Sequence, residues 1–131
     1  MAELERQFGA PVLEAYGMTE ASHQSATNPL PPAIRKPGSV GRGSNVEVAV
    51  MDKAGNLLQP GCPGEVVIRG ANVITAYEDN SEANQSSFTN GWFRTGDEGV
   101  LDSDGYLVVS LLPPQDVFRH GIRKLQEEVA R

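Results

Sequence analysis

Residues 92–110 read WFRTGDEGVLDSDGYLVVS, in which aromatic and branched residues flank a central Ser-Asp-Gly turn. Aromatic and β-branched residues favour strands, and Asp and Gly favour the tight turn between two of them. The pattern predicts an antiparallel hairpin with strands over residues 92–102 and 106–110. The run EVVIRG at residues 65–70 predicts a further, buried strand.

Working back along the chain, residues 46–109 show short strands separated by turns rich in Pro, Gly and Asp. A strand is expected over 46–51, followed by a hairpin turn over 52–56 and a return strand that begins at 57–58. A Pro/Gly turn is expected over 59–64, and one or two helical turns, capped by Ser81, over 81–88. Residues 46–109 are therefore expected to form a small antiparallel β subdomain.

The two ends of the chain have different residue patterns. Residues 2–8 predict a short helix closed by Gly9, and residues 11–16 predict a strand. Residues 28–43 contain four prolines and predict an irregular loop, in which Arg35 and Lys36 form a solvated basic pair. Beyond Pro113-Pro114, apolar residues at helical spacing predict an amphipathic helix. We expect three parts, 1–45, 46–109 and 110–131, in an α+β fold that is mainly β.

Composition limits the classes of partner. The chain has 131 residues, 17 acidic against 11 basic side chains and a formal charge of −6, which disfavours nucleic acid and anionic membranes as partners. The chain has one cysteine, no signal-peptide pattern at the N-terminus and no apolar run long enough to span a membrane. These features predict an intracellular, reducing location. The cytoplasm is expected; the C-terminal EVAR is not a peroxisomal signal, but the peroxisome stays open if a native C-terminus has been lost.

Two short runs carry a resemblance to a known family. They are Tyr16-Gly17-Met18-Thr19-Glu20 and GWFRTGD at residues 91–97, with GEVVIRG between them. In this order they resemble the adenylate-forming, AMP-binding enzymes: acyl- and aryl-CoA synthetases, luciferases and the adenylation domains of peptide synthetases. The flanking sequence, over about residues 5–109, is most similar to small-acid members of the oxalate–CoA ligase type.

This resemblance implies both a fold and a reaction. The fold is the C-terminal part of the family's large N-terminal domain, with one strand and a helix followed by a small antiparallel, barrel-like β subdomain. In the reaction a carboxylate attacks the α-phosphorus of ATP, pyrophosphate leaves, and the acyl-adenylate passes to coenzyme A. The implied cofactors are ATP or AMP, Mg²⁺ and coenzyme A, and the implied substrate is a small carboxylic acid.

Four residues are matched to the adenosine part of the site. Tyr16 supplies an aromatic face for adenine, and Gly17 lets the backbone approach the nucleotide because it has no side chain. Met18 lies in the same nucleotide-binding run. Asp97, after Thr95-Gly96, can accept hydrogen bonds from the ribose hydroxyls.

Four residues are matched to the reacting groups. Glu20 is a hard oxygen ligand for Mg²⁺, and the Thr19 hydroxyl can donate to the α-phosphate, so both are candidate catalytic residues. Ser22 and His23 are hypothesised to face the acid, where polar groups suit a short diacid such as oxalate or malonate better than an acyl chain. Without the family, Glu20-x-x-His23 would be half of a di-iron motif, which needs a second copy on long helices and is disfavoured.

The sequence also departs from the family. Members are expected to run to several hundred residues, with a Ser/Thr/Gly-rich phosphate loop ending in lysine, a lysine-bearing C-terminal domain and a Gly-Arg-x-Lys-Glu hinge after DGYL. Residues 108–114 read VVSLLPP instead. A changed reading frame, a retained intron and an incomplete gene model are open explanations, and the chain alone is expected to be inactive. The alternative is a non-catalytic β module that acts by protein association through an exposed former domain interface.

Several other residues are expected to be structural. Trp92 is expected in the core, Asp104 as the cap of the Ser-Asp-Gly turn, and Cys62 as a plain turn residue.

Overall fold

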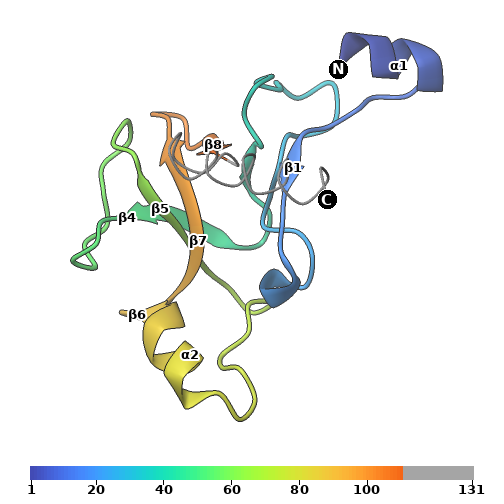
Figure 1. Cartoon of the computed structure of the whole chain (residues 1–131). Coiled ribbons are helices and arrows are strands. Elements are labelled where there is room, and N and C mark those ends of the chain that lie inside the picture. Colours follow the sequence, from blue (N-terminus) through green and yellow to red (C-terminus); the bar gives the residue numbers. More distant parts are fainter. Residues whose placement is uncertain (111–131) are drawn as a thin grey trace, which may run out of the picture.

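The computed structural model describes residues 1–110, which run from an N-terminal helix through two antiparallel sheets (Figure 1). In chain order the elements are α1 (Ala2–Phe8), β1 (Ala15–Tyr16), the 3₁₀ turn η1 (Thr19–Ala21), β2 (Ala26–Thr27), β3 (Arg42–Gly43), β4 (Glu47–Met51), β5 (Gly64–Arg69), α2 (Ser81–Ser87), β6 (Phe88–Thr89), β7 (Trp92–Leu101) and β8 (Leu107–Ser110). The helix expected after Pro113-Pro114 lies outside the described residues.

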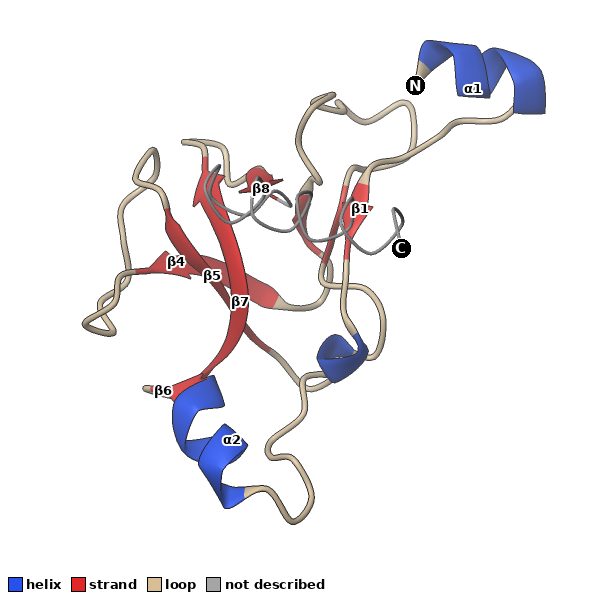
Figure 2. Cartoon of the chain, in the orientation of Figure 1, coloured by secondary structure: helices blue, strands red, loops and turns tan. Residues whose placement is uncertain are grey.

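The larger sheet has the strand order β4-β5-β7-β6, with β8 also paired to β7. Its longest strand, β7, curves along β5 (Figure 2), and both strands contribute to the core. Val66, Val67 and Ile68 of β5 have no exposed surface, and Phe93 of β7 is buried opposite Ile68. The β-branched run at residues 65–70 therefore forms the buried central strand that its composition predicts.

The smaller sheet has the order β1-β2-β3 and shares its core with the larger one. Tyr16 and Ala26 from the small sheet pack in one cluster with Ile68, Phe93 and Leu107 from the large sheet. The observed architecture, mainly β with short helices and a curled antiparallel sheet, confirms the predicted fold class. The three-part division of the chain stays a prediction.

The hairpin of residues 92–110 is confirmed, but its cap differs from the prediction. Oδ1 of Asp102 accepts hydrogen bonds from the main-chain N–H groups of Asp104 and Tyr106, both at 2.9 Å. The capping residue is thus Asp102, at the first position of the turn, where Asp is favoured. The prediction that Asp104 caps this turn is wrong.

Other expected elements are shorter or capped differently. Only Ala15–Tyr16 of the expected strand over 11–16 is a strand, and the return strand at Leu57 is a single bridge to Met51. Helix α2 is capped by the Asn80 side chain, which accepts from the Ala83 N–H at 3.1 Å, and not by Ser81.

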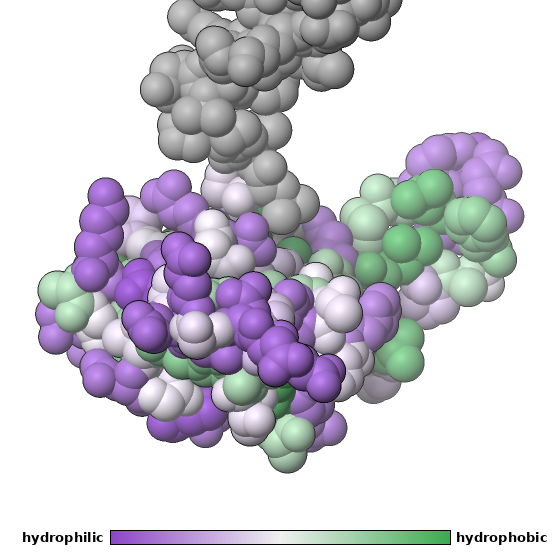
Figure 3. Space-filling model, turned by 60° about the horizontal axis from the view of Figure 1, so that its bottom comes forward, coloured by the Kyte–Doolittle hydropathy of each residue, from purple (hydrophilic) through white to green (hydrophobic). Residues whose placement is uncertain are grey.

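Helix α1 forms as predicted and ends at Gly9, whose φ of 62° lies in the left-handed region that glycine adopts readily. It buries none of its residues, and the side chains of Leu4 and Phe8 remain exposed. Apolar surface is visible on the lobe that projects to the right in Figure 3. Within residues 1–110, no helix has the length and apolarity needed to cross a lipid bilayer.

Candidate functional site

A hydrogen bond joins the two sequence motifs. The Tyr16 hydroxyl, on β1, donates to Oδ2 of Asp97, on β7, at 2.6 Å across 81 residues of sequence. Burial, followed by the hydrogen bond to the Asp97 carboxylate, raises the pKa of Tyr16 well above its usual value. Tyr16 is therefore a neutral donor at physiological pH, and the two motifs meet in the folded chain.

Asp97 reaches Tyr16 because the strand is irregular at this point. The pairing of β5 with β7 shifts between Glu65 and Val67, and Gly96 has a φ of 78°. The Thr95 hydroxyl donates to the Val66 carbonyl at 2.7 Å and accepts from the Asp97 N–H at 3.1 Å. Such bulges redirect side chains next to active sites. Here the bulge fixes the backbone that presents the Asp97 carboxylate.

The first motif forms a tight loop that closes on itself. The N–H of His23 donates to the Met18 carbonyl at 3.1 Å, and Ser22 and His23 have φ values of 51° and 89°. A Cβ on Gly17 would lie 1.6 Å from the His23 carbonyl oxygen, so only glycine fits there. The loop leaves the side chains of Thr19, Ser22 and His23 exposed.

Glu20 is held within this loop by a second segment of the chain. Its carbonyl accepts from the Ile74 N–H at 2.8 Å, and its Oε1 accepts from the Tyr77 hydroxyl at 3.0 Å. Within residues 1–110, its Oε2 accepts no hydrogen bond, and no group of three or more His, Cys, Asp or Glu side chains is placed to hold a metal. A single carboxylate with a free oxygen fits Mg²⁺, which takes one or two carboxylates and completes its shell with phosphate and water oxygens.

The structure thus brings the predicted residues together on one loop and the adjacent strand. Glu20 lies close enough to Tyr16 for its negative charge to add to the rise in the pKa of Tyr16. The roles assigned to these residues stay predictions. Tyr77 and Asn72, which contact the loop, were not predicted from the sequence. The one local feature that pointed to Tyr77 is that it is an aromatic residue in an otherwise irregular stretch.

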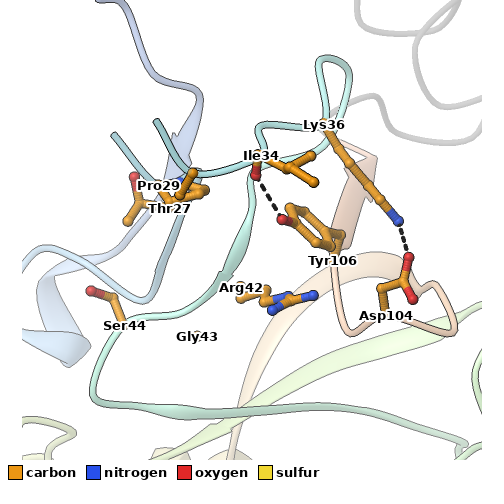
Figure 4. A pocket seen from close by; sticks show the side chains of 10 residues that line it. Thr27, Pro29, Ile34, Lys36, Arg42, Gly43, Ser44, Asp104 and Tyr106 are labelled. Atoms are coloured by element: carbon orange, nitrogen blue, oxygen red, sulfur yellow. Dashed lines mark hydrogen bonds and ion pairs between the residues drawn. The ribbon is translucent and has the colours of Figure 1, made fainter. Parts of the chain in front are cut away.

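A hollow of about 670 Å³ lies beside the β7–β8 turn (Figure 4). Lys36 Nζ is bonded there to Asp104 at 2.6 Å and to Asp102 at 2.7 Å, and it lies 4.6 Å from the centre of the Tyr106 ring. Arg35 pairs with Glu5. Arg35 and Lys36 keep 29% and 37% of their side-chain surface exposed, as a solvated pair would, but each also makes ion pairs that were not predicted. The predicted site residues do not line this hollow.

Comparison with known proteins identifies the family. The sequence profile of the AMP-binding enzyme family matches residues 1–78. The chain is 56% identical over 108 residues to a probable CoA ligase, CCL9, of Humulus lupulus, covering 82% of this chain and 21% of the relative. It is 53% identical over 110 residues to the oxalate–CoA ligase of Saccharomyces cerevisiae, covering 82% and 20%. The chain spans about a fifth of the length of these relatives.

Solved structures agree with the sequence matches. The O-succinylbenzoate coenzyme A synthetase of Bacillus subtilis in complex with ATP and magnesium ion is 38% identical, with a TM-score of 0.72, over 82% of this chain and 22% of that one. MatB of Rhodopseudomonas palustris, without ligand, is 36% identical with a TM-score of 0.73 over 82% and 22%. The chain therefore belongs to the AMP-binding enzyme family, among the adenylate-forming enzymes of the acyl-CoA synthetase type.

Proposed function

We propose that this chain is the part of an AMP-forming acid–CoA ligase that provides the adenosine and magnesium side of the active site. The observation that carries the proposal is the hydrogen bond between Tyr16 and Asp97, because it joins the two family motifs at one place. Glu20 lies beside this pair, on the loop that Tyr16 begins.

Each residue has a distinct role in this proposal. Asp97 accepts hydrogen bonds from the ribose through its remaining lone pairs. Tyr16, which is only 8% exposed, keeps that carboxylate oriented, a role different from the adenine contact expected from the sequence. Thr19 donates to the α-phosphate, where charge accumulates during attack by the acid. Glu20 would hold Mg²⁺, which supplies charge neutralisation on the phosphates when it is bound.

The acid is proposed to be small and to carry a second polar group. The exposed side chains of Ser22 and His23 lie directly after Glu20 on the same loop. Relatives named for oxalate, 2-succinylbenzoate and sulfoacetate act on acids with a second anionic group, which supports this choice. In a ligase that contains this segment, we expect His23→Ala to lower kcat/KM for small diacids; unchanged kcat/KM for every diacid tested contradicts this assignment.

Titration of AMP into the purified chain tests the nucleotide site. We expect saturable binding in the millimolar range or tighter, and a loss of about tenfold or more in Asp97→Ala, because the carboxylate can accept two hydrogen bonds from ribose. Asp104→Ala is the matched control, since it removes an equivalent carboxylate beside the hollow at the β7–β8 turn. The absence of binding at millimolar AMP contradicts the proposal.

Catalysis by these 131 residues alone is expected to be negligible. The family's phosphate loop and its lysine-bearing domain, which position and neutralise the reacting phosphates, do not occur in this sequence. ATP–pyrophosphate exchange with a panel of small acids measures this directly. Robust exchange by the purified chain contradicts the expectation.

A second candidate function, association with another protein, is favoured by exposed apolar side chains. Phe8 is 74% exposed and Ile34 is 76% exposed, and Leu4 and Leu30 are exposed as well. Exposed apolar surface favours association. Light scattering after size exclusion tests this: concentration-dependent oligomers that Phe8→Ser reduces support association, and a strictly monomeric chain contradicts self-association.

A further inference from the structure

The loop between β5 and α2 lies directly on the turn that carries Glu20. Three hydrogen bonds connect the main chain or side chain of this turn to residues 72–74. The Ile74 N–H donates to the Glu20 carbonyl, the Asn72 side chain donates to the Ala21 carbonyl at 2.8 Å, and the Ser22 hydroxyl donates to the Asn72 carbonyl at 3.1 Å.

A fourth hydrogen bond in this contact reaches the Glu20 carboxylate itself. The Tyr77 hydroxyl donates to Oε1 at 3.0 Å across 57 residues of sequence, and the Tyr77 ring packs against Phe93 with centroids 6.3 Å apart. In this bond the tyrosine hydroxyl is the donor and the carboxylate oxygen the acceptor, so one oxygen of Glu20 is held by Tyr77.

The backbone of Tyr77 is in turn held by Asn84 of α2. Asn84 Oδ1 accepts from the Tyr77 N–H at 2.7 Å, and its Nδ2 donates to the Tyr77 carbonyl at 2.9 Å. One side chain thus satisfies both polar groups of the Tyr77 main chain. The aromatic contact on one side and this amide on the other leave Tyr77 little freedom to turn its hydroxyl away from Glu20.

We propose that Tyr77 is a positioning residue for Glu20. Its hydroxyl donates a hydrogen bond to Oε1, which fixes the side-chain torsions of Glu20. Oε2 is then the oxygen that would coordinate Mg²⁺ bound to the nucleotide. Outer partners that orient a ligating carboxylate are a common requirement of metal sites. This inference rests on the proposed function, since it takes Glu20 as the magnesium ligand.

The test compares ATP binding to the purified chain by calorimetry, with millimolar magnesium and with a chelator in its place. Tyr77→Phe keeps the ring and removes the hydroxyl. We expect it to lower the magnesium-dependent gain in ATP affinity by about three- to tenfold while leaving the magnesium-free affinity unchanged. Tyr106→Phe is the matched control: it removes another tyrosine hydroxyl, which donates to the Ile34 carbonyl beside the hollow at the β7–β8 turn, and both affinities should stay as in the wild type.

Glu20→Gln separates this inference from the proposed function. If Glu20→Gln loses the magnesium-dependent gain and Tyr77→Phe keeps it, the positioning role is overturned and the proposed function stands. If Glu20→Gln keeps the gain, or the chain binds no ATP, the magnesium site itself is refuted.

Hydrogen exchange in the ligand-free chain adds a second readout. The N–H groups of Ala21 and Ser22, which close the turn on Met18 and Thr19, should exchange about threefold faster or more in Tyr77→Phe than in Tyr106→Phe. Equal exchange in the two variants overturns the inference.

Discussion

Replacing Tyr16 by Phe removes the hydroxyl that joins the two motifs and leaves the aromatic ring in the core. The Tyr16 side chain is 8% exposed, and its hydroxyl lies 2.6 Å from a carboxylate oxygen of Asp97. Hydrogen bonds to charged groups contribute about 1.5–3 kcal/mol to stability. At pH 7 we therefore expect Tyr16→Phe to lower the free energy of unfolding by about 2 kcal/mol.

The same bond predicts how this difference changes with pH. The folded chain holds the pKa of Tyr16 well above the value of about 10 that it has when unfolded. Above pH ~10 the unfolded state therefore binds fewer protons than the folded state, and the wild type loses stability as pH rises. The difference in free energy of unfolding between the wild type and Tyr16→Phe should therefore decrease by about 0.8 kcal/mol between pH 7 and pH ~10.5.

Urea unfolding at pH 7, 9 and ~10.5 measures this convergence. Other titrating groups are present in both proteins, so their effects cancel in the difference. Tyr106→Phe serves as a control, because its hydroxyl donates to the neutral carbonyl of Ile34 and its loss should cost only about 0.5–1.5 kcal/mol at pH 7. A stability difference between Tyr16→Phe and wild type that stays constant to pH ~10.5 refutes a neutral Tyr16 donating to Asp97.

Three further predictions test the fold, and two of them compare a variant with a matched control. Gly17→Ala should cost more than about 3 kcal/mol in urea unfolding, because backbone atoms occupy the space of its Cβ; Gly9→Ala, with open space and only a left-handed φ, should cost about 1 kcal/mol. Ile68→Ala should lower stability by about 2–5 kcal/mol, measured in the same way, because its side chain has no exposed surface. Asp102→Ala should destabilise the hairpin more than Asp104→Ala, read from hydrogen exchange of the β8 amides, because only Asp102 accepts hydrogen bonds from the turn backbone.

Local composition predicted much of the larger sheet. The β-branched residues at 65–70 and the turn chemistry at 103–105 act on their immediate neighbours, so the strands that they predict were found at almost the expected bounds. The family was recognised from the two runs at residues 16–20 and 91–97 taken together, and the comparisons confirm it.

Contacts between distant segments could not be predicted in this way. Lys36 was expected in solvent, yet it bonds Asp102 and Asp104 more than sixty residues away. Nothing near Lys36 in the sequence specifies that partner. Tyr77 was missed for the same reason, since its function in the fold depends on Glu20, 57 residues earlier. The choice of Asp102 as turn cap was accessible, because Asp is favoured at the first position of a type I turn.

The loop after Glu20 shows why the motif needs a second segment to keep its shape. Ser22 and His23 both adopt left-handed backbone angles, which cost non-glycine residues about 1–2 kcal/mol each. Local sequence preference therefore opposes this loop, and contacts from outside it must offset the cost. Asn72 supplies two of those contacts, as a donor to the Ala21 carbonyl and as an acceptor from the Ser22 hydroxyl. The residues of this motif are contiguous in sequence, but their geometry is a property of two segments about fifty residues apart.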